Sequence, residues 1–138
     1  MEEYTGEYLE LGPNRPSGQW QHYTYIKIGS QIIKNIYVLG SLDVVLRDQI
    51  QRQGIVKLWV IKWAFKPLII GVTQEDGQTF RQGLAKAYML LAFSLVVAAM
   101  TLTVGSFGFV LAPLALLGAF FSCIFIAKIK KLPADHSV

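Results

Sequence analysis

The sequence predicts an α+β membrane protein, in which a small β-rich domain is followed by a two-helix transmembrane hairpin. The stretch from 87 to 127 contains no Asp, Glu, Lys, Arg or His. A hydrocarbon core about 30 Å thick needs roughly 20 apolar residues per helix, so this stretch is long enough to cross a bilayer twice. Upstream of it, side chains alternate at the period of β-strands, and one short segment changes to the period of a helix.

The β-rich domain is expected to occupy residues 1–80. Alternating patterns rich in aromatic and β-branched side chains predict its strands at 4–10, 20–28, 31–39, 55–63 and 68–73, with a short return strand at 78–80. Gly29-Ser30 separates two of these runs and predicts a hairpin turn, because glycine supplies a positive φ. The cluster of Gly and Pro at 12–18 predicts a loop.

A short helix is expected at about 41–53, before the last strands of the domain. Four apolar side chains recur there at helical spacing: Leu42, Val45, Leu46 and Ile50. The Ser41 hydroxyl is expected to cap the helix, and Gly54 to end it. The resulting order β-β-β-α-β-β resembles a small β-barrel of the OB type. The resemblance rests on element order alone, and SH3-like barrels and rolled meanders are alternatives.

The two spans of the hairpin are expected at about 87–104 and 107–127, joined by a turn at Gly105–Gly108. A connector at 81–86 precedes them, and a basic cytoplasmic tail at 128–138 follows. Basic residues flank both ends and serve as topology anchors: Arg81, Lys86, Lys128, Lys130 and Lys131. Because basic residues remain on the cytoplasmic side, both termini are expected there, with the bacterial inner membrane as the expected location.

Small side chains recur at four-residue spacing within the spans, which favours close helix packing: Ser94, Ala98, Ala115, Gly118, Ala119 and Ser122. They indicate either packing of the two helices on each other or an oligomer interface. No ionisable group lies within either expected span, which weakens a role in transport.

No enzyme chemistry is expected from the sequence. Phosphate-binding loops, dinucleotide fingerprints and hydrolase signatures are absent from it. No Cys/His cluster suggests zinc, so no metal and no cofactor are expected. His22 has no serine or carboxylate partner by pattern.

One strand and its extension carry the best candidate for an interaction surface. Trp59, Ile61, Trp63 and Phe65 alternate on one side, with Lys62 and Lys66 beside them. Tryptophan and lysine favour the membrane interface, so this side is expected to meet lipid or a membrane protein partner. Single-stranded nucleic acid can bind a sheet with aromatic and basic side chains, but the proximity of the spans makes it an unlikely ligand.

The sequence therefore predicts a non-enzymatic integral membrane scaffold, accessory subunit or regulator. It would present a cytoplasmic β-barrel to a membrane protein partner or to a second copy of itself. A homo-oligomeric pore or membrane-permeabilising protein is one alternative. A membrane-tethered binder of single-stranded nucleic acid is the other.

Overall fold

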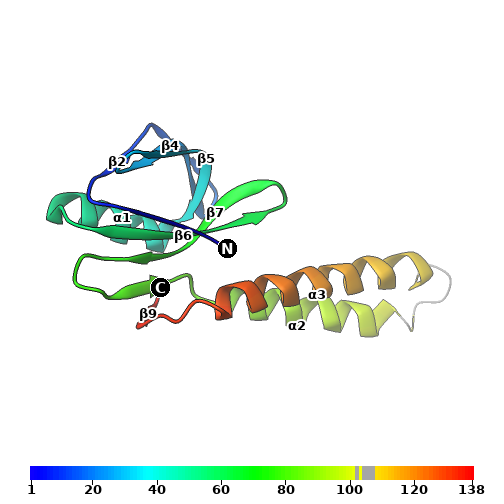
Figure 1. The fold of residues 1–138 in the computed structure, drawn as a ribbon. Coiled ribbons are helices and arrows are strands. Elements are labelled where there is room, and N and C mark those ends of the chain that lie inside the picture. Colours follow the sequence, from blue (N-terminus) through cyan, green and yellow to red (C-terminus); the bar gives the residue numbers. More distant parts are fainter. Residues whose placement is uncertain (102, 104–107) are drawn as a thin grey trace. The chain divides into compact units, whose positions relative to one another are not determined.

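The structure is a computed structural model that describes residues 1–101, 103 and 108–138. Within these residues it is an α+β protein with a mixed β-sheet and three helices (Figure 1). The chain divides into two compact units. Met1–Gln82 together with Leu132–Val138 form one unit, here called the β domain. Gly83–Lys131 form the other, here called the helix pair.

The β domain combines all of the described strands with one helix. The strands are β1 (Glu2–Gly6), β2 (Leu9–Leu11), β3 (Asn14–Ser17), β4 (Trp20–Ile28), β5 (Gln31–Leu39), β6 (Val56–Trp63), β7 (Lys66–Thr73), β8 (Thr79–Arg81) and β9 (His136–Ser137). Helix α1 (Gly40–Arg52) lies between β5 and β6. Pairing is antiparallel except between β5 and β7 and between β8 and β9.

The sheet is open, so the closed barrel expected from the sequence is wrong. Its strand order is β1-β6-β7-β5-β4-β2, and both ends of this order belong to the first segment of the chain. That segment is interrupted at Glu7 and Tyr8, where the expected strand 4–10 divides into β1 and β2. Among the described strands no ladder joins β1 to β2 or β4. A hydrogen bond of 2.9 Å from the Gly29 amide to the Tyr8 carbonyl extends the pairing of β2 with β4 by one residue and does not involve β1.

Local signals located β4, β5 and α1 correctly, but not the helix caps. Gly29 has a φ of 55°, as a tight turn between β4 and β5 requires. Leu39 is the N-cap residue of α1 and makes no side-chain cap hydrogen bond, so the expected cap by Ser41 is wrong. Gln53, with a φ of 49°, ends the helix in place of Gly54.

β3 and the first residues of β7 lie where the sequence predicts no strand, because pairing overrides the residue types. β3 lies in the expected loop, where Arg15 pairs with His22 of β4 although every residue of β3 is exposed. β7 begins at Lys66, and Pro67 pairs with Lys62 of β6. Proline is tolerated there because pairing of β7 with β5 begins only at Leu68.

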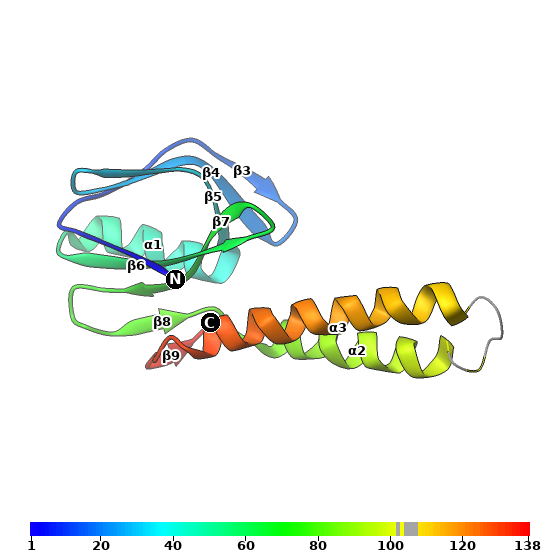
Figure 2. The ribbon, with the colours of Figure 1, turned by 45° about the vertical axis from the view of Figure 1, so that its right-hand side comes forward.

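The core of the β domain lies between the curved sheet and α1 (Figures 1 and 2). Leu42 and Leu46 of α1 are fully buried, one helical turn apart. The sheet contributes aliphatic side chains and one tyrosine: Tyr23, Ile26, Ile28, Ile33, Ile36, Val38, Val56, Leu58, Val60, Ile69 and Val72. Burial of this set is the main stabilising term for the domain.

The last seven residues of the chain belong to the β domain and not to a free tail. β9 pairs in parallel with β8, with Phe80 opposite His136 and their rings 5.1 Å apart. The amide of Asp135 donates to the Thr79 carbonyl at 3.0 Å, and the Thr79 amide donates back to the Asp135 carboxylate at 2.9 Å. Leu132 is fully buried. The expected basic tail at 128–138 therefore consists of a helix end followed by a docked strand.

The helix pair consists of α2 (Ala85–Thr101) and α3 (Gly108–Lys130), which lie side by side (Figure 2). In the described part of the chain, one helical segment is long and apolar enough to cross a membrane, namely Val110–Lys130. It has 21 residues and a mean hydropathy of 2.4, whereas α2 has 17 residues. Pro113 lies inside α3. The expected turn at Gly105–Gly108 falls outside the described residues, apart from Gly108, where α3 begins.

Candidate interaction surfaces

Small and hydroxyl side chains line the contact between α2 and α3. Ser94 and Ala98 are buried on α2, and Ala119 and Ser122 are buried on α3. A Cβ added to Gly118 would stand 3.3 Å from the Ser94 hydroxyl oxygen, so the two backbones approach closely at this point. Ala115, the remaining member of the predicted set, is half-buried. The structure therefore brings the predicted small residues together within one helix pair.

The hydroxyl groups in this contact are satisfied inside their own helices. The Ser94 hydroxyl donates to the Leu90 carbonyl at 2.9 Å, and the Ser122 hydroxyl donates to the Gly118 carbonyl at 2.8 Å. This back-bonding leaves no polar side-chain group of these serines in need of water. The interior of the helix pair thus combines small volume with internally satisfied polar groups.

The outward faces of both helices carry large apolar side chains. On α2 the exposed residues are Tyr88, Met89, Leu90, Phe93, Leu95, Val96 and Met100. On α3 they are Val110, Leu111, Leu114, Leu116, Leu117, Phe120 and Phe121. Cys123 is also exposed on this surface. Large residues outside and small ones inside reverse the arrangement of a water-soluble helix pair, whose apolar stripe faces inward.

Basic and aromatic side chains gather at the ends of the helix pair that adjoin the β domain in sequence. The Lys130 ammonium lies 5.5 Å from the centre of the Tyr88 ring. Lys86 lies in the first turn of α2, and Lys128 and Lys130 lie in the last turn of α3. Lys131, the next residue, is exposed. Lysine near tyrosine is the pairing that membrane–water interfaces favour.

Arg81 differs from the other predicted anchors because it belongs to the β domain. It lies in β8, and its guanidinium donates to the Leu132 carbonyl at 3.2 Å. The Val138 amide donates to the Arg81 carbonyl at 2.9 Å. Arg81 thus holds both ends of the docked C-terminal segment, and the predicted connector at 81–86 shortens to the residues just before α2.

The predicted aromatic side of β6 is interrupted by an irregularity in the ladder. The register with β7 shifts between Trp59 and Val60, and Val60 and Ile61 are both buried. Ile61 therefore does not share an exposed side with its neighbours. The Trp59 indole donates to the Thr73 hydroxyl at 3.0 Å and is half-buried, as is Trp63. Only Phe65 of the predicted set is fully exposed among the described residues.

The two predicted lysines of this region, Lys62 and Lys66, and the neighbouring Lys57 have partners within the domain. Lys62 forms an ion pair of 3.2 Å with Glu2, and Lys57 forms one of 2.7 Å with Glu3. Both glutamates come from β1, which lies beside β6. The Lys66 ammonium lies 4.9 Å from the centre of the Tyr37 ring. Exposed ion pairs of this kind contribute little to stability. The charge of Lys62 is nevertheless balanced by Glu2.

A cross-strand row that the sequence analysis missed lies beside Phe65. Arg15 pairs with His22, His22 pairs with Tyr37, and Lys66 covers Tyr37. The His22 and Tyr37 rings lie 4.7 Å apart. The Gly29-Ser30 turn fixes the pairing of His22 with Tyr37, so this part was open to prediction. The positions of Arg15 and Lys66 could not be predicted. Arg15 lies on β3, an unexpected strand, and Lys66 reaches Tyr37 only because β7 pairs in parallel with β5.

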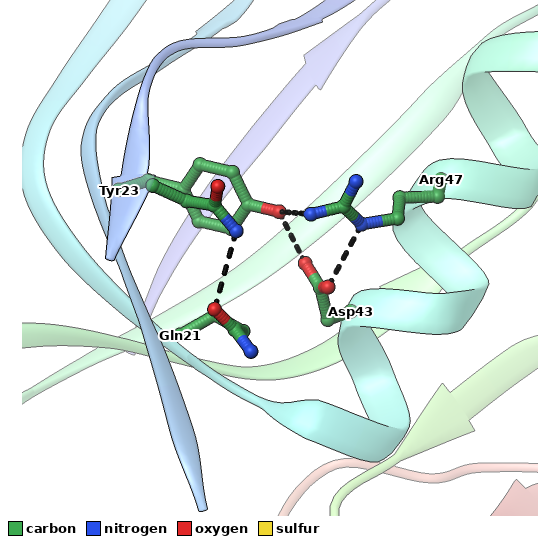
Figure 3. Close-up of polar contacts among 5 residues, drawn as sticks. Gln21, Tyr23, Asp43 and Arg47 are labelled. Atoms are coloured by element: carbon green, nitrogen blue, oxygen red, sulfur yellow. Dashed lines mark hydrogen bonds and ion pairs between the residues drawn. The ribbon is translucent and has the colours of Figure 1, made fainter. Parts of the chain in front are cut away.

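A buried polar cluster joins α1 to β4 (Figure 3). The Tyr23 hydroxyl donates to the Asp43 carboxylate and accepts a hydrogen bond of 3.1 Å from Arg47. The Arg47 guanidinium also pairs with Asp43 at 2.9 Å. Burial and the Asp43 carboxylate together raise the pKa of Tyr23 to about 12, and Asp43 raises the pKa of Arg47. Every member has partners, so the cluster fixes α1 against the sheet.

No group of three or more His, Cys, Asp and Glu side chains able to hold a metal ion occurs among the described residues. No protein-family profile, curated protein sequence or solved structure matches this chain.

Proposed function

We propose that the chain is a non-enzymatic integral membrane scaffold that crosses the bilayer twice and presents its β domain on the cytoplasmic side. The observation that carries the proposal is the reversed composition of the helix pair. Large apolar side chains face outward on α2 as well as on α3, and small ones lie between the helices. Leaving two such surfaces in water would cost about 25 cal/mol for each Å² of apolar area.

Chain connectivity supports two crossings in place of one. β8 precedes α2, β9 follows α3, and both strands belong to the same sheet. A chain that enters a membrane from one folded unit and returns to that unit crosses an even number of times. If Val110–Lys130 spans the bilayer, α2 must form the other crossing. At 1.5 Å per residue, the 17 residues of α2 cover about 25 Å, slightly less than a hydrocarbon core.

The lysines support a cytoplasmic position for both ends. Lys86, Lys128, Lys130 and Lys131 flank the helix pair where it joins the β domain in sequence. Basic residues close to membrane spans are retained on the cytoplasmic side. The C-terminal segment would lie on that side as well, because it is part of the β domain.

A scaffold is favoured over a pore by the use of the hydroxyl groups. Ser94 and Ser122 are buried and bonded to carbonyls of their own helices. Thr101 is likewise buried, with its hydroxyl bonded to Ala98 at 2.8 Å. These groups would have to turn outward to line a water-filled channel between copies. The outward surface is apolar, as contact with lipid or with another membrane helix requires.

Topology labelling tests the proposal. In a cysteine-free Cys123→Ala background, single cysteines replace Ser106, Asp76 or Val138, and intact cells are treated with a membrane-impermeant maleimide. We expect labelling at Ser106 only, with labelling at the other two positions after the membrane is opened. Extraction of the chain by alkaline carbonate, or labelling of Asp76→Cys and Ser106→Cys from the same side, would contradict two crossings.

The scaffold role is tested by gentle detergent purification from the native host. A scaffold should retain a defined stoichiometric partner, either another membrane protein or a second copy of this chain. Mass measurement of the intact complex identifies that partner. Recovery of a monomer alone under conditions that preserve other membrane complexes would contradict the role, and ion conductance in liposomes would favour the pore.

A further inference from the structure

The turn between β6 and β7 presents an apolar side chain to solvent in an unfavourable backbone conformation. Trp63 pairs with Lys66, so Ala64 and Phe65 form a two-residue turn. Their φ angles are 48° and 65°, values that such turns usually assign to Asn and Gly. Phe65 is fully exposed. A bulky residue retained at a strained and exposed position suggests a function for the side chain itself.

The charges next to this turn are positive and unbalanced. The described ion pairs of the β domain use Glu2, Glu3, Glu10, Asp43 and Asp48. Among the described residues, no carboxylate lies within ion-pair distance of Arg15 or Lys66. Arg15 and Lys66 stand at the two ends of the row that contains His22 and Tyr37. The row therefore joins two exposed cations beside an exposed phenyl ring.

The aromatic rings of the row are poorly placed to stack nucleic acid bases. Tyr37 is half-buried, and its ring contacts His22 on one hand and the Lys66 ammonium on the other. Binding of single strands uses several open ring faces on which successive bases stack. Phe65 alone does not provide such a series. A single apolar tip beside cations matches a lipid interface, where the ring enters the headgroup region and the cations meet phosphates.

We propose that the Ala64–Phe65 turn, together with Arg15 and Lys66, is a second membrane contact that docks on an anionic lipid surface. The inference rests on the proposed function, because it assumes that the helix pair already holds the chain at a bilayer. Docking would orient the β domain relative to the membrane that anchors it. Lys62, bonded to Glu2, contributes little to this contact.

The test uses the full chain in lipid nanodiscs with an environment-sensitive fluorophore on Ala64→Cys in the Cys123→Ala background. Ala64 is exposed, so the label leaves Phe65 in place. We expect a blue shift and quenching by spin-labelled lipid headgroups in anionic nanodiscs but not in zwitterionic ones. A label on Asp76→Cys, in an exposed turn elsewhere on the domain, should show neither change.

Variants separate charge from apolar insertion. Arg15→Gln and Lys66→Gln should each reduce the ratio of docked to undocked chains about fivefold. This is the change that corresponds to the attraction of about 1 kcal/mol between one cation and an anionic membrane surface. Phe65→Ser should reduce it about tenfold or more. Lys27→Gln removes the same charge from an exposed site on β4 paired with Glu10, and should leave the ratio unchanged.

A label on Phe120→Cys distinguishes the two proposals. If quenchers within the acyl chains reach Phe120→Cys but the Ala64→Cys label remains in water in anionic nanodiscs, the docking proposal is wrong and the membrane anchor stands. If Phe120→Cys is not quenched, the proposed function itself fails. A single-stranded oligonucleotide that shifts the Ala64→Cys label in zwitterionic nanodiscs, while anionic lipid does not, would overturn docking in favour of nucleic acid binding.

Discussion

Replacing Tyr23 with Phe should lower the free energy of unfolding at neutral pH. It should also remove the loss of stability that ionisation of Tyr23 causes at alkaline pH. The Tyr23 side chain is 1% exposed, and its hydroxyl lies between Asp43 and Arg47. Phenylalanine keeps the ring in the core and deletes only the hydroxyl. A hydrogen bond to a charged group contributes about 1.5–3 kcal/mol, so the variant should lose about that amount at neutral pH.

The pH dependence follows from the direction of the Tyr23 pKa shift. Burial, followed by Asp43, raises this pKa from 10.0 to about 12 in the folded chain. The raised value means that the stabilising contribution is complete below pH 10 and is lost as the pH rises towards 12. Two pKa units correspond to about 3 kcal/mol. The stability difference between wild type and Tyr23→Phe should therefore shrink across this interval.

Urea unfolding of the detergent-solubilised chain measures this difference. All three tryptophans lie in strands of the β domain, so their fluorescence reports that domain alone. The pKa values of Tyr4 and Tyr25 are also raised, by hydrogen bonds to Glu2 and Glu10. Both tyrosines are present in the wild type and in the variant, so their effects on the stability difference cancel. A difference that stays constant from pH 8 to above pH 11 would refute the reasoning, because it would mean that Tyr23 ionises equally in folded and unfolded chains.

Three further variants test separate parts of the structure. Ala64→Asn with Phe65→Gly should relieve the strained turn and raise the free energy of unfolding by about 1–2 kcal/mol, as measured by the same urea titration. Leu132→Ala should lower it by about 2–5 kcal/mol and speed hydrogen exchange in β8, because a fully buried side chain is lost. Gly118→Leu should force α3 away from Ser94 and lower the midpoint of helix unfolding, followed by circular dichroism.

Exposed neighbours provide the matched controls. Val138→Ala removes an apolar side chain from the same docked segment as Leu132, but from a position that is 36% exposed, so its effect should be much smaller. Leu117→Ala changes an outward side chain next to Gly118 and should leave the midpoint in detergent unchanged. If either control matches its partner, burial is not the cause of the effect.

Elements encoded by short-range patterns were predictable from the sequence. The Gly29-Ser30 turn set the register of β4 and β5, and periodic apolar residues located α1 within one residue. The absence of charge from 87 to 127 likewise indicated apolar helices, and Gly118 of that stretch does approach Ser94 closely. These features depend on neighbours close in sequence, for which period and turn chemistry are direct signals.

Features that depend on distant segments were not predictable. β9 is two residues long and forms only because it pairs with β8, from which α2 and α3 separate it in the sequence. The register shift at Trp59 depends on β7, which changes partner from β5 at Ile69 to β8 at Gly71. Strict alternation consequently placed Ile61 on the wrong side. Arg15 was overlooked because its Pro-containing strand has the composition of a loop.

Both proposed membrane contacts are attached to β7, so their separation can be measured along that strand. Leu132, which directly follows the helix pair, is placed against Gly71 in the middle of β7. Phe65 lies six residues away along the same ladder, or about 20 Å at 3.3 Å per residue. A domain held at one point beside a bilayer can pivot, whereas attachments about 20 Å apart on a rigid ladder restrict its tilt. Relief of the strained turn by Ala64→Asn with Phe65→Gly would then stabilise the domain while it weakens the second attachment, and stability and function would change in opposite directions.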